Sequence, residues 1–255
     1  MADGVEHGDR RDRDEGPDDA ADDDARGDAE DHRERVNPCG PAEEQRLTNE
    51  ITALGRETGQ GLYVVYVDEF DTVELNASFY RWPTPARFTQ WRDQLPDGFT
   101  MTVKAPRGLT HARRLGSPEQ WIERIAAGWD ALGNRRAALL VQLHPAQQRD
   151  DERLDHFLSA VPDSIPVAME LRHPSWDDPA VYDLLRGHGA AYVVMSGPGL
   201  PCVVTATAGL AYLRLHGPGE EAMYSGSYDT EELRRWAREI RAWDADTVVQ
   251  KLEQN

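Results

Sequence analysis

Short apolar segments alternate with longer amphipathic segments along the chain from about residue 61 onward. The short segments have the composition of β-strands, whereas the long segments carry apolar residues at the spacing of one helix face. One strand and one helix together take roughly thirty residues, as in a βαβ unit. The pattern therefore predicts an α/β protein with a parallel sheet.

Six segments are predicted to form strands, and residues 246–249 are a candidate seventh. The six cover residues 72–76, 99–104, 138–144, 166–172, 190–195 and 210–216. Five helices are also predicted. Three of them begin with a capping residue followed by proline, namely Thr84-Pro85, Ser117-Pro118 and Asp178-Pro179. The other two cover residues 150–161 and 229–243.

The 255 residues suffice for one TIM-type barrel, a fold that commonly takes about 250 residues. Residues 36–255 are predicted to form a single parallel (β/α) barrel, incomplete because only six or seven strands are apparent. Residues 1–35 contain 15 acidic and 6 basic residues and almost no large apolar side chain. Such a segment cannot bury enough surface to offset the entropy lost on folding, so a disordered acidic tail is expected.

The formal net charge is −18, and the chain contains 26 Asp but only two Lys, at positions 104 and 251. An acidic, lysine-poor surface suits a cytoplasm of high salt, where surface repulsion is screened, so a halophilic protein is expected. Neither a secretory signal nor an apolar window of membrane-spanning length is apparent, which predicts a cytoplasmic protein without membrane contact. Cys39 and Cys202 lack companions at metal-ligand spacing, so no metal site is predicted.

Polar residues occupy one period-two face near the carboxyl end of five predicted strands. The alternating apolar residues are expected to face the helices, so the polar set should point into the barrel. The set consists of Glu74, Asn76, Thr102, Lys104, Gln142, His144, Glu170, Arg172, Tyr212, Arg214 and His216. Barrel enzymes place their chemistry at this end of the strands, which makes the set a candidate functional site.

The charges of this set do not balance. Lys104, Arg172 and Arg214 stand against Glu74 and Glu170. A positive excess inside an acidic protein indicates a bound anion such as a phosphate or a carboxylate. Alternatively, the charges form internal ion pairs that only neutralise one another, although burying several such pairs usually costs more than apolar replacements would.

Loops beside the strand ends add further candidates for substrate contact. Two glycine-rich loops, residues 217–219 and 225–227, could offer backbone N–H groups to a phosphate. Trp176 could cover the pocket, although packing on a helix is favoured. The candidates for substrate contact besides the three cations are Asn76, His111, Gln142, His173, Tyr224 and Tyr228. No nucleophile elbow, Walker loop or dinucleotide fingerprint is present in the sequence, so the reaction class and the cofactor stay open.

The strand-end motifs together resemble those of the YecE-like family, a domain of unknown function numbered 72. The matching segments lie within about residues 61–243 and cover residues 70–80, 103–106, 110–111, 140–143, 170–176, 212–217 and 224–228. The resemblance implies a TIM-type barrel with these residues at the family's pocket positions: Glu74, Lys104, Gln142, Glu170, Arg172, His173, Arg214 and His216. It implies no substrate, because the family has no settled activity.

Two motifs of that family are not found. The acidic tail takes the place of an opening strand of the Gly-Thr-Ser-Gly-Trp type, and residues 247–255 lack a Phe-Asn-Asn-Asp type ending. First and last strands are neighbours in a closed barrel. The barrel is therefore expected to be open on that side unless residues 36–61 fill the gap.

Three functions are compatible with these observations. The leading hypothesis is an enzyme, a hydrolase or an isomerase, that acts on a phosphorylated or sugar-like small molecule. In this enzyme the three cations hold the anion, Glu74 or Glu170 is the general base, and His216 or His144 is the acid. A metal-assisted phosphodiester hydrolase acting on nucleic acid ranks lower because the inward carboxylates are few. A truncated, inactive or partner-binding paralogue is the third, favoured by the missing last-strand motif.

Overall fold

Six parallel strands form one sheet in the computed structural model of this protein, which describes residues 70–219 and 226–243. The strands are β1 (Thr72–Leu75), β2 (Thr100–Lys104), β3 (Arg136–Gln142), β4 (Val167–Glu170), β5 (Ala191–Ser196) and β6 (Tyr212–Leu215). They are hydrogen-bonded in sequence order, and every neighbouring pair is parallel. All six predicted strands are confirmed, with ends that differ from the predicted ones by at most two residues.

The α-helices follow the strands along the chain. They are α4 (Ala77–Tyr80), α5 (Pro85–Gln94), α6 (Glu119–Leu132), α7 (Asp151–Ala160), α8 (Pro179–Gly187) and α9 (Thr230–Ala242). Helices α5 to α9 are the five predicted ones. The predicted caps of α5 and α8 are confirmed, because the side chains of Thr84 and Asp178 accept hydrogen bonds from backbone N–H groups of the first turn.

The predicted cap of α6 is wrong. Pro118 occupies the N-cap position, and the helix begins at Glu119. Ser117 has a φ of 48°, and Arg114 and Leu115 before it also lie in the left-handed region. No side chain accepts a hydrogen bond from the first turn of α6 at the N-cap position. A short π-helix, η1 (Gly108–Ala112), precedes the turn and was not predicted.

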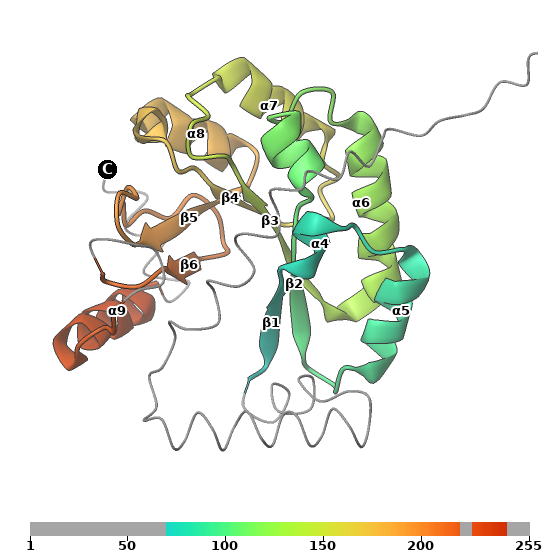
Figure 1. Cartoon of the computed structure of the whole chain (residues 1–255), viewed down its shortest axis with the longest axis horizontal. Coiled ribbons are helices and arrows are strands. Elements are labelled where there is room, and N and C mark those ends of the chain that lie inside the picture. The colour runs from blue at the N-terminus through green and yellow to red at the C-terminus, as the bar shows by residue number, and fades with distance from the viewer. Residues whose placement is uncertain (1–69, 220–225, 244–255) are drawn as a thin grey trace, which may run out of the picture. The chain divides into compact units, whose positions relative to one another are not determined.

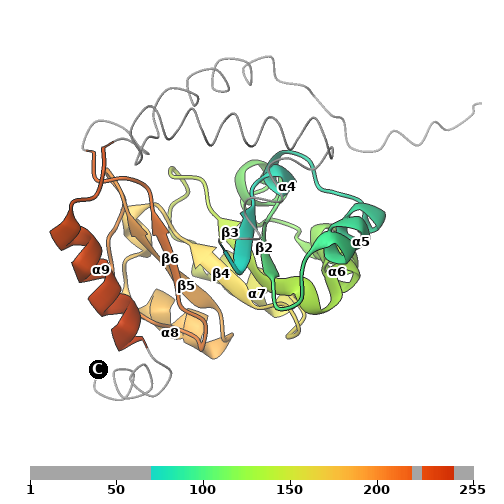
Figure 2. The same ribbon diagram turned by 90° about the horizontal axis from the view of Figure 1, so that it is seen from below.

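The sheet is strongly curled. In a flat sheet, β1 and β6 would lie five strand spacings apart, about 24 Å, which is too far for their side chains to meet. Yet Nη2 of Arg214 on β6 lies 2.7 Å from Oε1 of Glu74 on β1. Figures 1 and 2 show the strands as an arc with α5 to α9 on its convex side. The described residues thus form a curled, half-barrel parallel sheet.

The hydrophobic core lies between the convex face of the sheet and the helices. Val103 and Val141 on the strands belong to one buried cluster with Phe88 of α5, Phe157 of α7 and Leu185 of α8. Burial of the outward-facing residues fixes which face of each strand is left for the concave side.

Several predicted features lie outside the described residues: the acidic tail at 1–35, the segment 36–61, and the candidate strand at 246–249. The residues that are described fall within a unit that comprises Asn37–Asn255. Among the described helices, none has both the length and the apolar character needed to cross a membrane.

Candidate functional site

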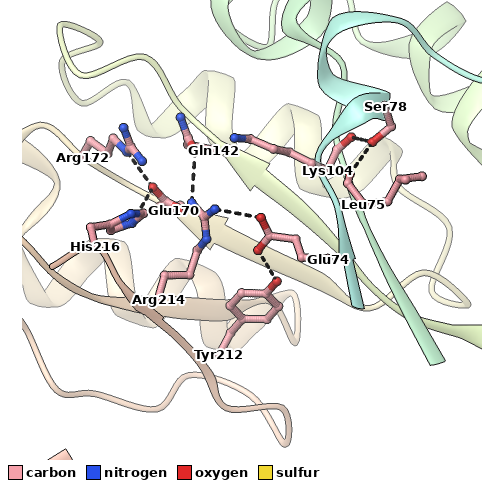
Figure 3. Close-up of polar contacts among 10 residues, drawn as sticks. All are labelled: Glu74, Leu75, Ser78, Lys104, Gln142, Glu170, Arg172, Tyr212, Arg214 and His216. Atoms are coloured by element: carbon pink, nitrogen blue, oxygen red, sulfur yellow. Dashed lines mark hydrogen bonds and ion pairs between the residues drawn. The ribbon is translucent and has the colours of Figure 1, made fainter. Parts of the chain in front are cut away.

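Polar side chains from five strands converge on the concave face, at the carboxyl end of the sheet. Register partners on neighbouring parallel strands share a face, so Glu74 lies beside Thr102 and Gln142 beside Glu170. Figure 3 shows these side chains grouped together: Glu74, Lys104, Gln142, Glu170, Arg172, Tyr212, Arg214 and His216. All of them belong to the predicted inward-facing set, and all except Tyr212 are predicted catalytic or substrate-contact residues. On β5 the partner of Arg214 is Met195, so that strand contributes an apolar side chain at this level.

Arg214 is the centre of the group. Its Nη1 donates to Oε2 of Glu170 at 2.6 Å and to Oε1 of Gln142 at 3.2 Å. Its Nη2 donates to Oε1 of Glu74 at 2.7 Å. One guanidinium therefore joins both carboxylates of the site, and it ties β6 to β1 across the concave face.

Glu170 is held by two arginines. Its side chain is fully buried, and Nε of Arg172 donates to Oε1 at 2.6 Å while Arg214 occupies Oε2. Burial opposes ionisation, but the two guanidinium groups outweigh it and hold the pKa of Glu170 below its usual range. This part of the site is the internal ion-pair network that the sequence left open as an alternative.

Glu74 is paired with a tyrosine as well as with Arg214. The Tyr212 hydroxyl donates to Oε2 of Glu74 at 2.8 Å, and the Glu74 side chain is 21% exposed. Burial, followed by the nearby Glu74 charge, raises the pKa of Tyr212 well above its usual value, so the phenol stays protonated and donates. Tyr212 belongs to the predicted inward-facing set but is not among the predicted catalytic or substrate-contact residues.

Lys104 is placed differently from the two arginines. Its Nζ lies 4.6 Å from the centroid of the Phe79 ring, and the residue is 9% exposed. The Ser78 hydroxyl lies 2.7 Å from the carbonyl oxygens of both Leu75 and Lys104, which holds α4 against β2. Burial, and then the Arg214 charge, lowers the pKa of Lys104 to about 8. Its Nζ makes no hydrogen bond or ion pair with any residue of the described ranges.

Two more side chains of the site have donor groups without an acceptor among the described residues. Only Nε of the Arg172 guanidinium has an acceptor in the described part of the chain, and the side chain is 9% exposed. The Gln142 amide uses its oxygen to accept from Arg214, and its Nε2 has no acceptor among the described residues. Figure 3 shows the free ends of Arg172, Gln142 and Lys104 directed to the same side of the network.

Two histidines adjoin Lys104 through Phe79. The His111 ring packs edge-on against Phe79 at 4.9 Å and against His144 at 5.2 Å, between centroids. Burial, together with His144 and Lys104, lowers the pKa of His111 to about 4, so the ring is neutral near pH 7. Nδ1 of His144 accepts from the Ala146 N–H at 3.1 Å, so a neutral His144 carries its proton on Nε2.

His216 is buried beside Glu170. Its Nε2 lies 3.8 Å from Oε1 of Glu170, and burial lowers the pKa of His216 to about 4. Gly197 makes room for it, because a Cβ at that position would lie 2.9 Å from the His216 Cβ. The backbone N–H of His216 donates to the Ser196 carbonyl at 2.7 Å, and the Tyr228 hydroxyl donates to Oγ of Ser196 at 3.2 Å. Tyr228 thus reaches the border of the site.

Two other candidates, His173 and Asn76, lie apart from the network. Nδ1 of His173 accepts from the Ser175 N–H at 3.1 Å and caps a 3₁₀ turn, η3 (Pro174–Trp176). Asn76 is exposed and makes no side-chain cap at the start of α4. Tyr224 lies outside the described residues.

The structure also shows the contacts of the glycine-rich loops and of Trp176. The glycine-rich loops approach each other, because a Cβ on Gly226 would lie 3.3 Å from the Gly219 nitrogen. Trp176 is buried and donates from Nε1 to the Gln147 carbonyl at 2.8 Å, so it packs. Across residues 70–219 and 226–243, no group of three or more His, Cys, Asp or Glu side chains could hold a metal ion.

Known proteins share this sequence and this fold. Residues 55–253 match the family model described as protein of unknown function DUF72. The UPF0759 protein YecE of Escherichia coli is 29% identical over 113 residues, which are 44% of this chain and 41% of YecE. The UPF0759 protein YunF of Bacillus subtilis is 25% identical over 206 residues, 69% of this chain and 73% of YunF. The chain thus spans less than half of the YecE sequence that it matches.

Two crystal structures of DUF72 family proteins have a similar fold. The protein from Thermotoga maritima superposes with a TM-score of 0.61 at 30% identity, over 71% of this chain and 76% of that one. The protein from Enterococcus faecalis gives a TM-score of 0.59 at 19% identity, over 73% of this chain and 82% of that one. The second match supports the fold alone.

Proposed function

The chain belongs to the DUF72 family, the YecE-like family of the sequence analysis, and from its site we propose that it is an enzyme acting on a small anionic molecule. The substrate, phosphorylated or sugar-like, binds at the carboxyl end of the sheet. In this proposal the six-stranded sheet of the described residues is part of a TIM-type barrel, as the family resemblance implies. The family supplies no substrate, so the proposal rests on the site residues.

One observation carries this proposal: three donors on largely buried side chains of the site have no acceptor in the described part of the chain. They are Nζ of Lys104, the terminal nitrogens of Arg172 and Nε2 of Gln142. Hydrogen bonds from such donors are stronger in a partly desolvated site than in water, above all when the donor is charged. A bound anion would satisfy all three groups.

The charge balance supports an anion rather than a neutral ligand. Glu74 and Glu170 offset two of the three cations, because both carboxylates are bonded to arginine. One positive charge therefore remains. The two terminal nitrogens of Arg172 suit a phosphate or a carboxylate, which can accept two parallel hydrogen bonds from a guanidinium.

The surroundings of the two carboxylates suggest different roles. Glu170 is buried between two guanidinium groups that lower its pKa, which makes it a poor proton acceptor and a good anchor for the arginines. Glu74 is partly exposed and lies at the edge of the network, so it is the better general base. In this proposal Arg214 positions the two carboxylates, and His144 serves as the acid, because burial lowers the pKa of His216 to about 4 and leaves that ring neutral near pH 7.

A metal-assisted hydrolase acting on nucleic acid is the weaker alternative. In the described ranges no observation favours it, and the grouped charges of the site are mainly cations.

Titration calorimetry with inorganic phosphate in molar potassium chloride tests the anion site. We expect saturable binding of one phosphate per chain, and we expect Arg172→Gln and Lys104→Gln each to weaken it about tenfold or more. Arg186→Gln is the matched control, because Arg186 lies in the last turn of α8 and pairs with the exposed Asp183. Absence of binding, or equal binding by all variants, would overturn the proposal.

A further inference from the structure

The residue type at position 104 is unusual for this chain. Of the 28 basic residues, only Lys104 and Lys251 are lysines, so the chain uses arginine at nearly every position that needs a positive charge. The guanidinium of arginine stays protonated and cannot act as a nucleophile in proteins. A lysine among the arginines of the site suggests that an amine is required there in addition to a positive charge.

The contacts of Lys104 fit a reactive amine. Arg214, not Lys104, takes the carboxylate oxygens of Glu74 and Glu170 that face the centre of the site. The Lys104 amine lies instead over the face of Phe79, in a residue that is 9% exposed. Desolvation and neighbouring cations are the two devices by which proteins make a lysine nucleophilic.

Charged groups on β1 and β6 and at the end of β4 act on this amine. Arg214 and Arg172 lower the pKa of Lys104, and Glu170 and Glu74 raise it. Burial is the largest effect, and the resulting pKa of about 8 leaves roughly a tenth of the amine unprotonated at pH 7. An ordinary exposed lysine would have less than about a thousandth of its amine in this form.

We propose that the Lys104 amine forms an imine with a carbonyl group of the bound molecule, whose anionic group is held by Arg172 and Gln142. The substrate class is therefore an anionic aldehyde or ketone, such as a 2-oxo acid or a phosphorylated sugar in its open form. This inference rests on the proposed function, because the anion site is what brings the carbonyl group to Nζ.

The step is balanced without an oxidant or a reductant. The Nζ lone pair attacks the carbonyl carbon, a C–N bond forms as the carbonyl π bond breaks, and one of the two Nζ protons passes to the carbonyl oxygen. The resulting carbinolamine loses its hydroxyl group as water while the nitrogen loses its remaining proton and the C=N bond forms. Glu74, on the strand next to Lys104 and bonded to the Tyr212 hydroxyl, is placed to accept and return these protons.

Pyridoxal 5′-phosphate, an aldehyde with a phosphate group, is a suitable probe for trapping with borohydride. The full chain offers only two lysines and its terminal amine, so mass spectrometry of peptides can assign every adduct. We expect reduction to fix the probe on Lys104 about tenfold or more faster than on Lys251. Lys251→Arg should keep this labelling, and Lys104→Arg should abolish it while retaining the thermal unfolding temperature.

The matched probe is pyridoxal, which lacks the phosphate. Arg172→Gln should slow labelling by pyridoxal 5′-phosphate and leave labelling by pyridoxal unchanged, and inorganic phosphate should compete only with the former. Equal labelling of Lys104 and Lys251, or no adduct on Lys104, would overturn the proposal that Lys104 forms an imine. If phosphate still binds in the calorimeter in that case, the anion site stands alone; if it does not bind, both proposals fail.

Discussion

Glu170→Gln should destabilise the fold by about 3–5 kcal/mol, although it replaces a single oxygen by nitrogen. The Glu170 side chain has no exposed surface, and each carboxylate oxygen accepts a guanidinium hydrogen bond at 2.6 Å. A hydrogen bond to a charged group contributes about 1.5–3 kcal/mol. In the variant, one of the two arginines faces an amide N–H group instead of an acceptor. Arg172 and Arg214 also lose the negative charge that they share. Water cannot replace it, because their side chains are only 9% and 12% exposed, respectively.

Urea denaturation followed by far-ultraviolet circular dichroism measures this loss. With a slope of about 2 kcal/mol per molar urea, the midpoint should fall by roughly 2 M. Asp183→Asn is the matched control, because Asp183 is 73% exposed in its ion pair with Arg186, and an exposed pair contributes about 1 kcal/mol or less. If Glu170→Gln costs no more than this control, the buried network does not stabilise the fold as reasoned.

The effect of Glu170 should also depend on pH with a definite sign. The pKa of Glu170 is lower in the folded protein than in the unfolded chain, so ionised Glu170 stabilises the fold. This stabilisation is complete above the unfolded pKa of about 4.3 and is lost as the pH falls through the folded pKa. The difference in unfolding free energy between the natural protein and Glu170→Gln should therefore be constant near neutrality and shrink in acid.

Three further predictions concern other residues of the site. Tyr212→Phe removes a hydrogen bond to the partly exposed Glu74, which water can replace, so denaturation should show a loss of about 1 kcal/mol. Gly197→Ala places a Cβ 2.9 Å from that of His216, so it should cost about 1–3 kcal/mol and shift the His216 ring signals in NMR spectra. Lys104 binds its proton less tightly when folded, so stability should rise with pH from about 8 towards 10. Lys104→Met should lack this rise, and a variant that kept it would show that another group titrates.

The sequence was sufficient to predict the strands, the main helices and the inward polar face. These features follow from local periodicity, which alternates Glu74 with Leu75 and Lys104 with Val103. The turn before α6 was missed because Ser117 carries a normal capping signal, while its left-handed backbone depends on the turn as a whole. The four-residue helix α4 is too short to show a period.

The contacts between the side chains of the site could not be predicted from the sequence. Glu74 and Glu170 look alike there, but one lies at an edge strand and is partly exposed, whereas the other is buried between two arginines. Arg214 contacts Glu74 only because the whole sheet is curled, and no local sequence pattern encodes this curl. Phe79 beneath the Lys104 amine was missed for a similar reason, since it lies on the unpredicted helix α4.

A crystal structure of the protein soaked with selenate tests the anion site most directly, because selenium scatters anomalously and marks the position of a bound tetrahedral anion. We expect an anomalous peak within hydrogen-bonding distance of Lys104 Nζ and the terminal nitrogens of Arg172, and no such peak in crystals of Arg172→Gln. Peaks confined to surface arginines, with the space beside Lys104 and Arg172 empty at saturating selenate, would contradict the proposed site.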